Sequence, residues 1–117
     1  MKPHSFQIPY SVVDKLPPME RFVYYELSRL ASPVAKKDTI FHVNIPARGL
    51  IINHFRLAKE MDFPYSRVSF AMEQLEKKEL IEIHPLNHKE FRSYYLVYVR
   101  KVYQENEIPL SPPEFSF

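Results

Sequence analysis

The sequence predicts an α+β domain of three helices and a small antiparallel sheet. Residues 53–78 carry two amphipathic patterns separated by a short turn, and residues 80–99 are rich in β-branched and aromatic side chains. The length of 117 residues suits one hydrophobic core and is too short for two. We expect a domain over residues 1–103, with helices at about 18–31, 53–62 and 64–78, a β-hairpin at about 80–99, and a proline-rich tail over 104–117.

The N-terminal segment is expected to be an arm that leads into the first helix. Residues 6–8, Phe-Gln-Ile, alternate as a short edge strand does, and Pro9 ends that strand because proline has no N–H for the ladder. Pro18 suits the first turn of the helix over 18–31, where a missing N–H costs nothing. The apolar positions of one buried stripe follow at helical spacing, at Met19, Val23, Leu27 and Leu30.

Aromatic side chains widen the apolar surface of this helix beyond its stripe. They are Phe22, Tyr24 and Tyr25. One interpretation is that they pack in the core and under the N-terminal arm. The other is that they form a dimer contact, since a wide apolar face can exceed what a small core needs.

The segment between the first and second helices is expected to contain a strand. Residues 39–43, Thr-Ile-Phe-His-Val, are partly β-branched and alternate in polarity. Residues 46–49, Pro-Ala-Arg-Gly, indicate a turn that leads to the apolar residues 50–52.

The second and third helices are expected to form a compact pair. Asn53 suits the N-cap of the second helix, because its side-chain oxygen can accept a backbone N–H of the first turn. Asp62 lies at the turn, where aspartate tolerates a left-handed backbone, and Pro64 can open the third helix. The buried stripes are Leu57, Ala58 and Met61 on one helix and Val68, Met72 and Leu75 on the other.

The predicted hairpin has strands at about 80–84 and 91–99, joined by a polar loop at 85–90. Its second strand is aromatic and β-branched on both faces. One face is expected to meet the helices. The other is expected to be covered by the N-terminal arm or by a second subunit.

The run from Arg56 to Ile81 resembles winged helix-turn-helix DNA-binding domains, which commonly read L-A-x-x, a small turn, and then x-S-x-x-T-V-x-x-x-L-x-x-L-x-x-x-G-L-I. Pro64 stands where a serine cap is usual in the family, and Glu79 stands where the family often has glycine. The resemblance implies a three-helix core in which the strand at 39–43 pairs with the hairpin, the wing. The matching positions are Leu57, Ala58, Val68, Met72, Leu75, Leu80 and Ile81.

A second resemblance extends the likeness to residues 6–100. The stretch from Phe6 to Leu27 looks like the entry to the winged helices of plasmid and phage replication initiators, in which an F-x-I-P arm precedes a first helix with a Y-x-x-L pattern. It implies a homodimer that acts in transcriptional regulation or in replication initiation of a mobile element.

The resemblance also implies that double-stranded DNA is the partner and that the third helix lies in its major groove. Arg67 could then donate to guanine, and Phe70 could meet a thymine methyl group. Residues of the second helix and of the wing tip would contact the phosphate backbone. The expected DNA-binding residues are Tyr65, Ser66, Arg67, Ser69 and Phe70 on the third helix, with Arg56, Lys59, His88, Lys89 and Arg92 as backbone contacts.

Other interpretations of the same residues stay open. Glu73 and Glu76 oppose phosphate, so the outer face of the third helix could equally be a solvated surface. The wing tip could be an ordinary polar turn. Lys77 and Lys78 fit better as partners of their helix dipole than as DNA contacts. The alternative function is a winged helix that binds a protein partner through its aromatic surface or its tail.

The charge of the chain is mild and unevenly spread. Residues 104–117 hold Glu105, Glu107 and Glu114 without a lysine or arginine, so a net charge of +2 for the whole chain leaves +5 for residues 1–103. A modestly positive domain suits DNA contact without requiring it.

The composition excludes several classes of site. The chain has no cysteine, so it has neither disulfides nor thiolate metal sites, which fits a cytoplasmic protein. Its single glycine excludes glycine-rich loops that hold nucleotide phosphates. Pro85 between His84 and His88 removes the helical geometry of a metal-binding pair. With no catalytic constellation and no apolar run long enough for a membrane span, we expect a non-enzymatic protein without cofactor, metal or membrane.

Overall fold

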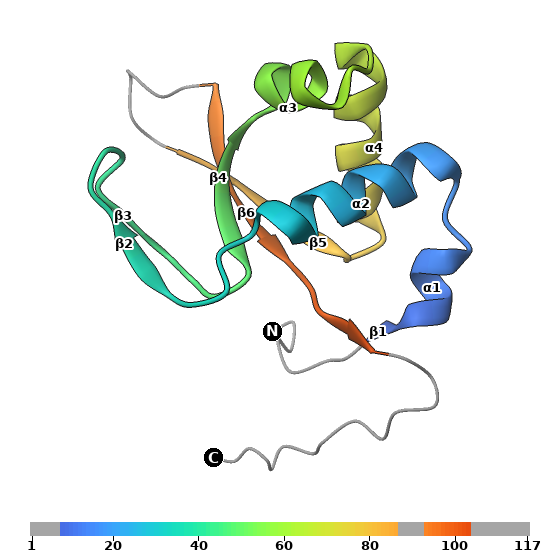
Figure 1. Ribbon diagram of the computed structural model, residues 1–117, viewed down its shortest axis with the longest axis horizontal. Helices are drawn as coiled ribbons and strands as arrows, with labels where there is room; N and C mark the ends of the chain where they lie inside the picture. Colours follow the sequence, from blue (N-terminus) through green and yellow to red (C-terminus); the bar gives the residue numbers. More distant parts are fainter. Residues whose placement is uncertain (1–7, 87–92, 104–117) are drawn as a thin grey trace.

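The computed structural model describes residues 8–86 and 93–103 (Figure 1). The fold is α+β, as predicted, and Figure 1 shows helices gathered on one side of a small sheet. The helices are α1 (Tyr10–Asp14), α2 (Pro18–Leu30), α3 (His54–Met61) and α4 (Tyr65–Lys77). The strands are β1 (Ile8–Pro9), β2 (Lys36–Asp38), β3 (Val43–Ile45), β4 (Gly49–Asn53), β5 (Ile81–Pro85), β6 (Tyr94–Val99) and β7 (Val102–Tyr103).

The main sheet has the order β4-β6-β5 and is antiparallel throughout. Its central strand β6 pairs with β4 through Leu96 opposite Ile51, and with β5 through Val97 opposite Ile83. Strands β2 and β3 form a separate antiparallel hairpin, and β1 pairs in parallel with β7. In Figure 1 the β1–β7 pair lies at the end of the molecule opposite α3, so the two ends of the described chain meet far from the α3–α4 pair.

The core lies where α2 and α4 pack together and against the main sheet. Val23 on α2, Val68 on α4 and Val97 on β6 are all fully buried. Burying such side chains is the main favourable term in folding, at about 1.5–3 kcal/mol each. Every position that matches the winged-helix pattern is at most 3% exposed, namely Leu57, Ala58, Val68, Met72, Leu75, Leu80 and Ile81.

The turn between α3 and α4 has the chemistry that the sequence predicts. Asn53 caps α3, because its Oδ1 accepts the backbone N–H groups of Phe55 at 2.8 Å and Arg56 at 3.2 Å. Asp62 is left-handed, with φ 61° and ψ 42°. Pro64 is the N-cap of α4, one residue before the helix. The expected helices at about 18–31, 53–62 and 64–78 therefore correspond to α2, α3 and α4.

The predicted strand over residues 39–43 is wrong except at Val43, which begins β3. Residues 39–42 form the turn of the β2–β3 hairpin, because the Asp38 carboxylate accepts the N–H groups of Ile40 at 2.9 Å and Phe41 at 2.8 Å. Such local side-chain bonds compete with strand pairing. The strand that pairs with the β5–β6 hairpin is instead β4, which was expected only as an apolar stretch before the Asn53 cap. The only glycine, Gly49, starts β4 at a place where a Cβ would lie 2.9 Å from the Pro46 carbonyl oxygen.

The N-terminal half departs from prediction in detail. Tyr24 belongs to the core at 2% exposure, whereas Leu30, expected in the buried stripe, is 36% exposed. The short helix α1 was not predicted. The expected strand at residues 6–8 is present only as β1, since Phe6 and Gln7 lie outside the described residues. The expected tail over 104–117 lies outside them as well.

Candidate nucleic-acid interface

Helix α4 separates an inner and an outer face sharply. Val68 and Met72 on its inner face are fully buried. The residues predicted to read DNA lie outside this buried face: Tyr65, Ser66, Arg67 and Phe70 are exposed, and Ser69 is half-buried. Phe70 is 59% exposed, an unusual state for a phenylalanine on a helix whose other face supplies the core.

Helix α3 adds exposed basic residues near the start of α4. Arg56 and Lys59 are both exposed. Figure 1 shows α3 lying beside the N-terminal half of α4, at the end of the molecule away from β1 and β7. The predicted contacts on the second and third helices therefore gather at one end of the domain.

The arginines of the described chain fall into two groups. Those outside α3 and α4 are held by hydrogen bonds or ion pairs within the protein. The side chains of Arg56, Lys59 and Arg67 form no such bond to another described residue. They keep their donors available for a ligand. The bonded arginines are Arg21, Arg29, Arg48 and Arg100.

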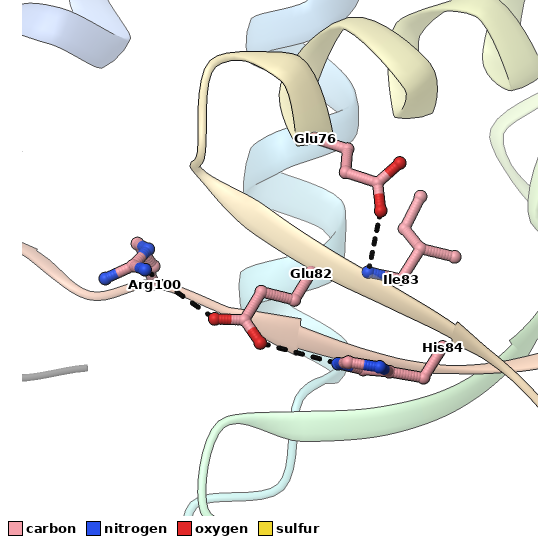
Figure 2. Close-up of polar contacts among 5 residues, drawn as sticks. All are labelled: Glu76, Glu82, Ile83, His84 and Arg100. Carbon is pink, nitrogen blue, oxygen red and sulfur yellow. Dashed lines mark hydrogen bonds and ion pairs between the residues drawn. The ribbon is translucent and has the colours of Figure 1, made fainter. Parts of the chain in front are cut away.

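The stem of the β5–β6 hairpin is stiffened by a polar network (Figure 2). The Glu82 carboxylate lies 3.6 Å from Nη2 of Arg100 and 3.4 Å from Nε2 of His84. Arg100 is only 2% exposed, so its charge is held inside the domain rather than offered to a partner. The predicted wing-tip contacts His88, Lys89 and Arg92 lie outside the described residues.

One of the two glutamates expected to oppose DNA is exposed but also bonded to a neighbouring strand. Figure 2 shows Glu76 pointing toward β5, where its carboxylate accepts the backbone N–H of Ile83 at 3.3 Å. This bond caps an outward-facing amide of the edge strand, a common protection against unwanted strand pairing. Glu73 is exposed on the outer face of α4.

Lys78 has a partner that the sequence did not predict. It is the C-cap residue of α4, where a cation is expected to complement the helix dipole, and its ammonium group also forms an ion pair with Glu20 on α2. The Glu20 side chain is only 8% exposed, so this pair joins α2 to the end of α4. Sequence spacing gives no sign of it, since the two residues are 58 positions apart.

Phe55 is the surface residue that the sequence analysis missed. It is the second residue of α3 and is 63% exposed, and its ring stacks on Tyr65, the first residue of α4. The ring centroids are 4.1 Å apart and the planes differ by 14°. Phe55 could have been recognised from the sequence, because it is an aromatic residue outside the buried stripe of its helix.

His54 lies beside this pair at the start of α3. Its ring stacks on Tyr95 of β6 with centroids 4.8 Å apart, and its Nε2 is buried without a hydrogen-bond partner among the described residues. Burial disfavours the charged form and lowers the pKa of His54 below its usual value. The first turn of α3 therefore carries a neutral imidazole at neutral pH.

An open hollow of about 390 Å³ lies between α2 and the α3–α4 turn. Phe22 and Phe63 line it and stack with centroids 6.3 Å apart, and the Tyr25 hydroxyl donates to the Tyr10 hydroxyl at 2.7 Å. Phe22 is 49% exposed and Tyr25 is 39% exposed. The aromatic surface of the first helix is thus divided, with Tyr24 in the core and these two residues outside it.

The described residues contain no group of three or more histidine, aspartate or glutamate side chains arranged to hold a metal ion. The longest of the described helices have 13 residues each, and none is long and apolar enough to cross a membrane. Comparison of the chain with known proteins found no matching family model, no matching curated protein and no matching solved structure. A function can therefore be argued only from the chemistry of the residues themselves.

Proposed function

We propose that this domain is a winged helix-turn-helix that binds double-stranded DNA without catalysing a reaction. The order helix, tight turn, helix and hairpin agrees with that fold in α3, α4, β5 and β6. Glu79 lends further support, because its φ of 64° is the left-handed conformation that the glycine of the family pattern would favour. The role would be transcriptional regulation or replication initiation, as the resemblance implies.

One observation carries the DNA-binding proposal. The exposed basic side chains of α3 and α4, Arg56, Lys59 and Arg67, have no bonded partner among the described residues, whereas every described arginine elsewhere has one. Unbonded cations gathered on a helix pair suit a polyanion, since each can neutralise a phosphate and release a counterion.

The residues divide into two roles under this proposal. Arg67 lies in the first turn of α4, the part of a recognition helix that reaches base edges, so it would read sequence. Arg56 and Lys59 on α3, with Lys89 of the predicted wing tip, would contact the phosphate backbone and supply affinity for any sequence. Ser66, Ser69 and Phe70 would complete the readout surface.

Charge reversal tests the location of this interface. Arg67→Glu should weaken binding to a mixed-sequence duplex by about tenfold or more, because it removes one favourable charge and adds a repulsive one. Lys101→Glu is the matched control, since Lys101 is exposed but lies between β6 and β7, away from α3. It should change the affinity by less than about threefold, because salt screens a charge that lies away from the proposed interface. Equal losses for both variants would contradict the proposed interface.

A second function has a specific observation in its favour. The hollow beside α2 exposes Phe22 and Tyr25, and an exposed aromatic hollow is typical of protein contacts. The domain would then bind a protein partner or a second copy of itself through α2, either instead of DNA or together with it. Sedimentation of the wild type and of Phe22→Glu across a concentration series separates these cases. A dimer lost in the variant supports self-association through α2, and a monomer at all concentrations excludes it.

A further inference from the structure

The Phe55–Tyr65 pair presents a flat aromatic face to solvent. The two rings are nearly parallel, with centroids 4.1 Å apart and planes 14° from each other. Tyr65 therefore covers one face of the Phe55 ring. Because the Phe55 side chain is still 63% exposed, its open area lies on the opposite face and at the ring edge.

Packing between the helices does not account for this exposure. Helices α3 and α4 are already held together by Leu57, Ala58 and Val68, each at most 3% exposed. A phenylalanine stabilises a fold mainly through the apolar area that it removes from water, and Phe55 removes little. The pair thus contributes less to the core than its size would allow, and its open face remains available to a ligand.

The surroundings of the pair favour an anionic ligand with an aromatic part. Arg56 follows Phe55 directly, and Arg67 lies two residues beyond Tyr65; both are exposed and unbonded within the described chain. Of the nearby carboxylates, Glu60 lies one helical turn after Arg56 on α3 and lines the hollow beside α2. Exposed aromatic rings with unbonded arginines in the same helical turns suit unpaired nucleotides, in which a base stacks on a ring and long cationic side chains reach the adjoining phosphates.

We propose that Phe55 and Tyr65 form a stacking site for an unpaired nucleobase within otherwise double-stranded DNA. The base lies on the open face of Phe55, and Arg56 and Arg67 hold the flanking phosphates. A paired base cannot occupy this site, because its neighbours in the duplex cover both of its faces. The inference rests on the proposed DNA binding and adds to it a preference for locally unpaired sites, such as those made when a duplex opens.

Three labelled duplexes of the same sequence test the site by fluorescence anisotropy. One is fully paired, one carries a single unpaired adenine, and one carries an unpaired abasic residue at the same place. The wild type should bind the adenine form about tenfold more tightly than the other two, in the range that one stacked base contributes. The abasic form controls for the flexibility of the backbone, since it has the same distortion without a base to stack.

Variants of Phe55 assign the preference to its ring. Phe55→Ala and Phe55→Leu should both abolish it, because leucine keeps apolar bulk but has no flat face, whereas Phe55→Tyr should retain it. Ile40→Ala is the control, since Ile40 is also a large apolar residue exposed to solvent but lies in the turn of the β2–β3 hairpin. It should keep the full preference. Circular dichroism and the melting temperature of each variant show that it is folded.

The outcomes separate this inference from the function on which it rests. Equal wild-type affinity for the three duplexes, or a preference that survives in Phe55→Ala, would overturn the stacking site and leave duplex binding intact. A loss in Ile40→Ala equal to that in Phe55→Ala would also overturn it. Failure to bind any of the three at low salt would overturn the proposed function and the stacking site together.

Discussion

The hydroxyl of Tyr24 donates a hydrogen bond to the main-chain carbonyl oxygen of Arg100 at 2.6 Å, across 76 positions in the sequence. This bond ties the middle of α2 to the residue that follows β6. Arg48 also donates to the same carbonyl, at 3.2 Å. The end of the sheet is therefore fixed to the helices by polar contacts as well as by the apolar core.

Removing this hydroxyl should destabilise the domain modestly. Tyr24→Phe should lower the free energy of unfolding by about 1 kcal/mol, the usual value of one buried hydrogen bond, because Arg48 still satisfies the carbonyl oxygen. Urea denaturation at pH 7 measures the change. A loss of more than about 3 kcal/mol would mean that the ring position itself depends on the bond.

The same variant should change the behaviour at alkaline pH. Burial raises the pKa of Tyr24, so the unfolded chain loses this proton first, above about pH 10. The stability from the neutral buried phenol is thus complete below pH 10 and falls as the pH rises toward the folded value. Tyr24→Phe should flatten this part of the profile in denaturation experiments between pH 9 and pH 11. An unchanged slope would contradict the assignment.

Acid should weaken the fold through His54. Because burial lowers its pKa, the unfolded chain takes up a proton first as the pH falls below about 6.5. The stability from the neutral imidazole is therefore complete above that pH and declines below it. His54→Phe, which can keep the stack on Tyr95, should show a smaller fall in the urea midpoint between pH 7.5 and pH 5.5 than the wild type. His42→Asn is the control, because His42 is exposed and asparagine tolerates its φ of 58°.

Glu79 should be a site where glycine improves stability. Its left-handed φ of 64° costs a residue with a Cβ about 1 kcal/mol, and glycine adopts this conformation freely. Glu79→Gly should therefore raise the free energy of unfolding by up to about 1 kcal/mol. Glu79→Ala removes the same carboxylate but keeps the Cβ, so it should give no such gain. Equal effects of the two substitutions would point to the charge instead of the backbone.

The division of roles on the DNA surface predicts two different kinds of loss. Arg67→Ala should reduce discrimination between a preferred site and random duplex, by about 1–3 kcal/mol if its contact is bidentate. Lys89→Ala should weaken binding to both duplexes alike and lower the salt dependence by about one phosphate contact. Competition experiments with a selected site and a random duplex measure both quantities. Loss of discrimination from both variants would show that the roles are wrongly divided.

The sequence predicts best the features that depend on neighbouring residues. Asn53 caps α3 and Asp62 adopts the left-handed turn because both effects need only a local side chain and a short stretch of backbone. The buried apolar residues of α3 and α4 could likewise be predicted, because they recur at helical spacing. The same local reasoning failed at residues 39–43, where β-branched composition favoured a strand and the Asp38 carboxylate instead fixed a turn.

Features that join distant residues could not be predicted in this way. The pairing of β4 with β6, the ion pair of Glu20 with Lys78 and the stack of Phe55 on Tyr65 all depend on how the elements pack. For the candidate site, the exposure of residues 65–67 and of Phe70 followed from the buried stripe opposite them. The absence of internal bonds to Arg56 and Arg67, which carries the proposal, could be known only with the described part of the chain folded.

Salt dependence of duplex binding tests the DNA-binding proposal most directly. Anisotropy of a mixed-sequence duplex should show micromolar or tighter binding at low salt, with the logarithm of the affinity falling linearly against the logarithm of salt concentration. Each neutralised phosphate adds about −0.9 to this slope. If Arg56, Lys59 and Lys89 each neutralise one phosphate, the slope should be about −2.7 or steeper. Absence of binding at low salt, or an affinity that does not change with salt, would contradict the proposal and favour a protein partner at the hollow beside α2.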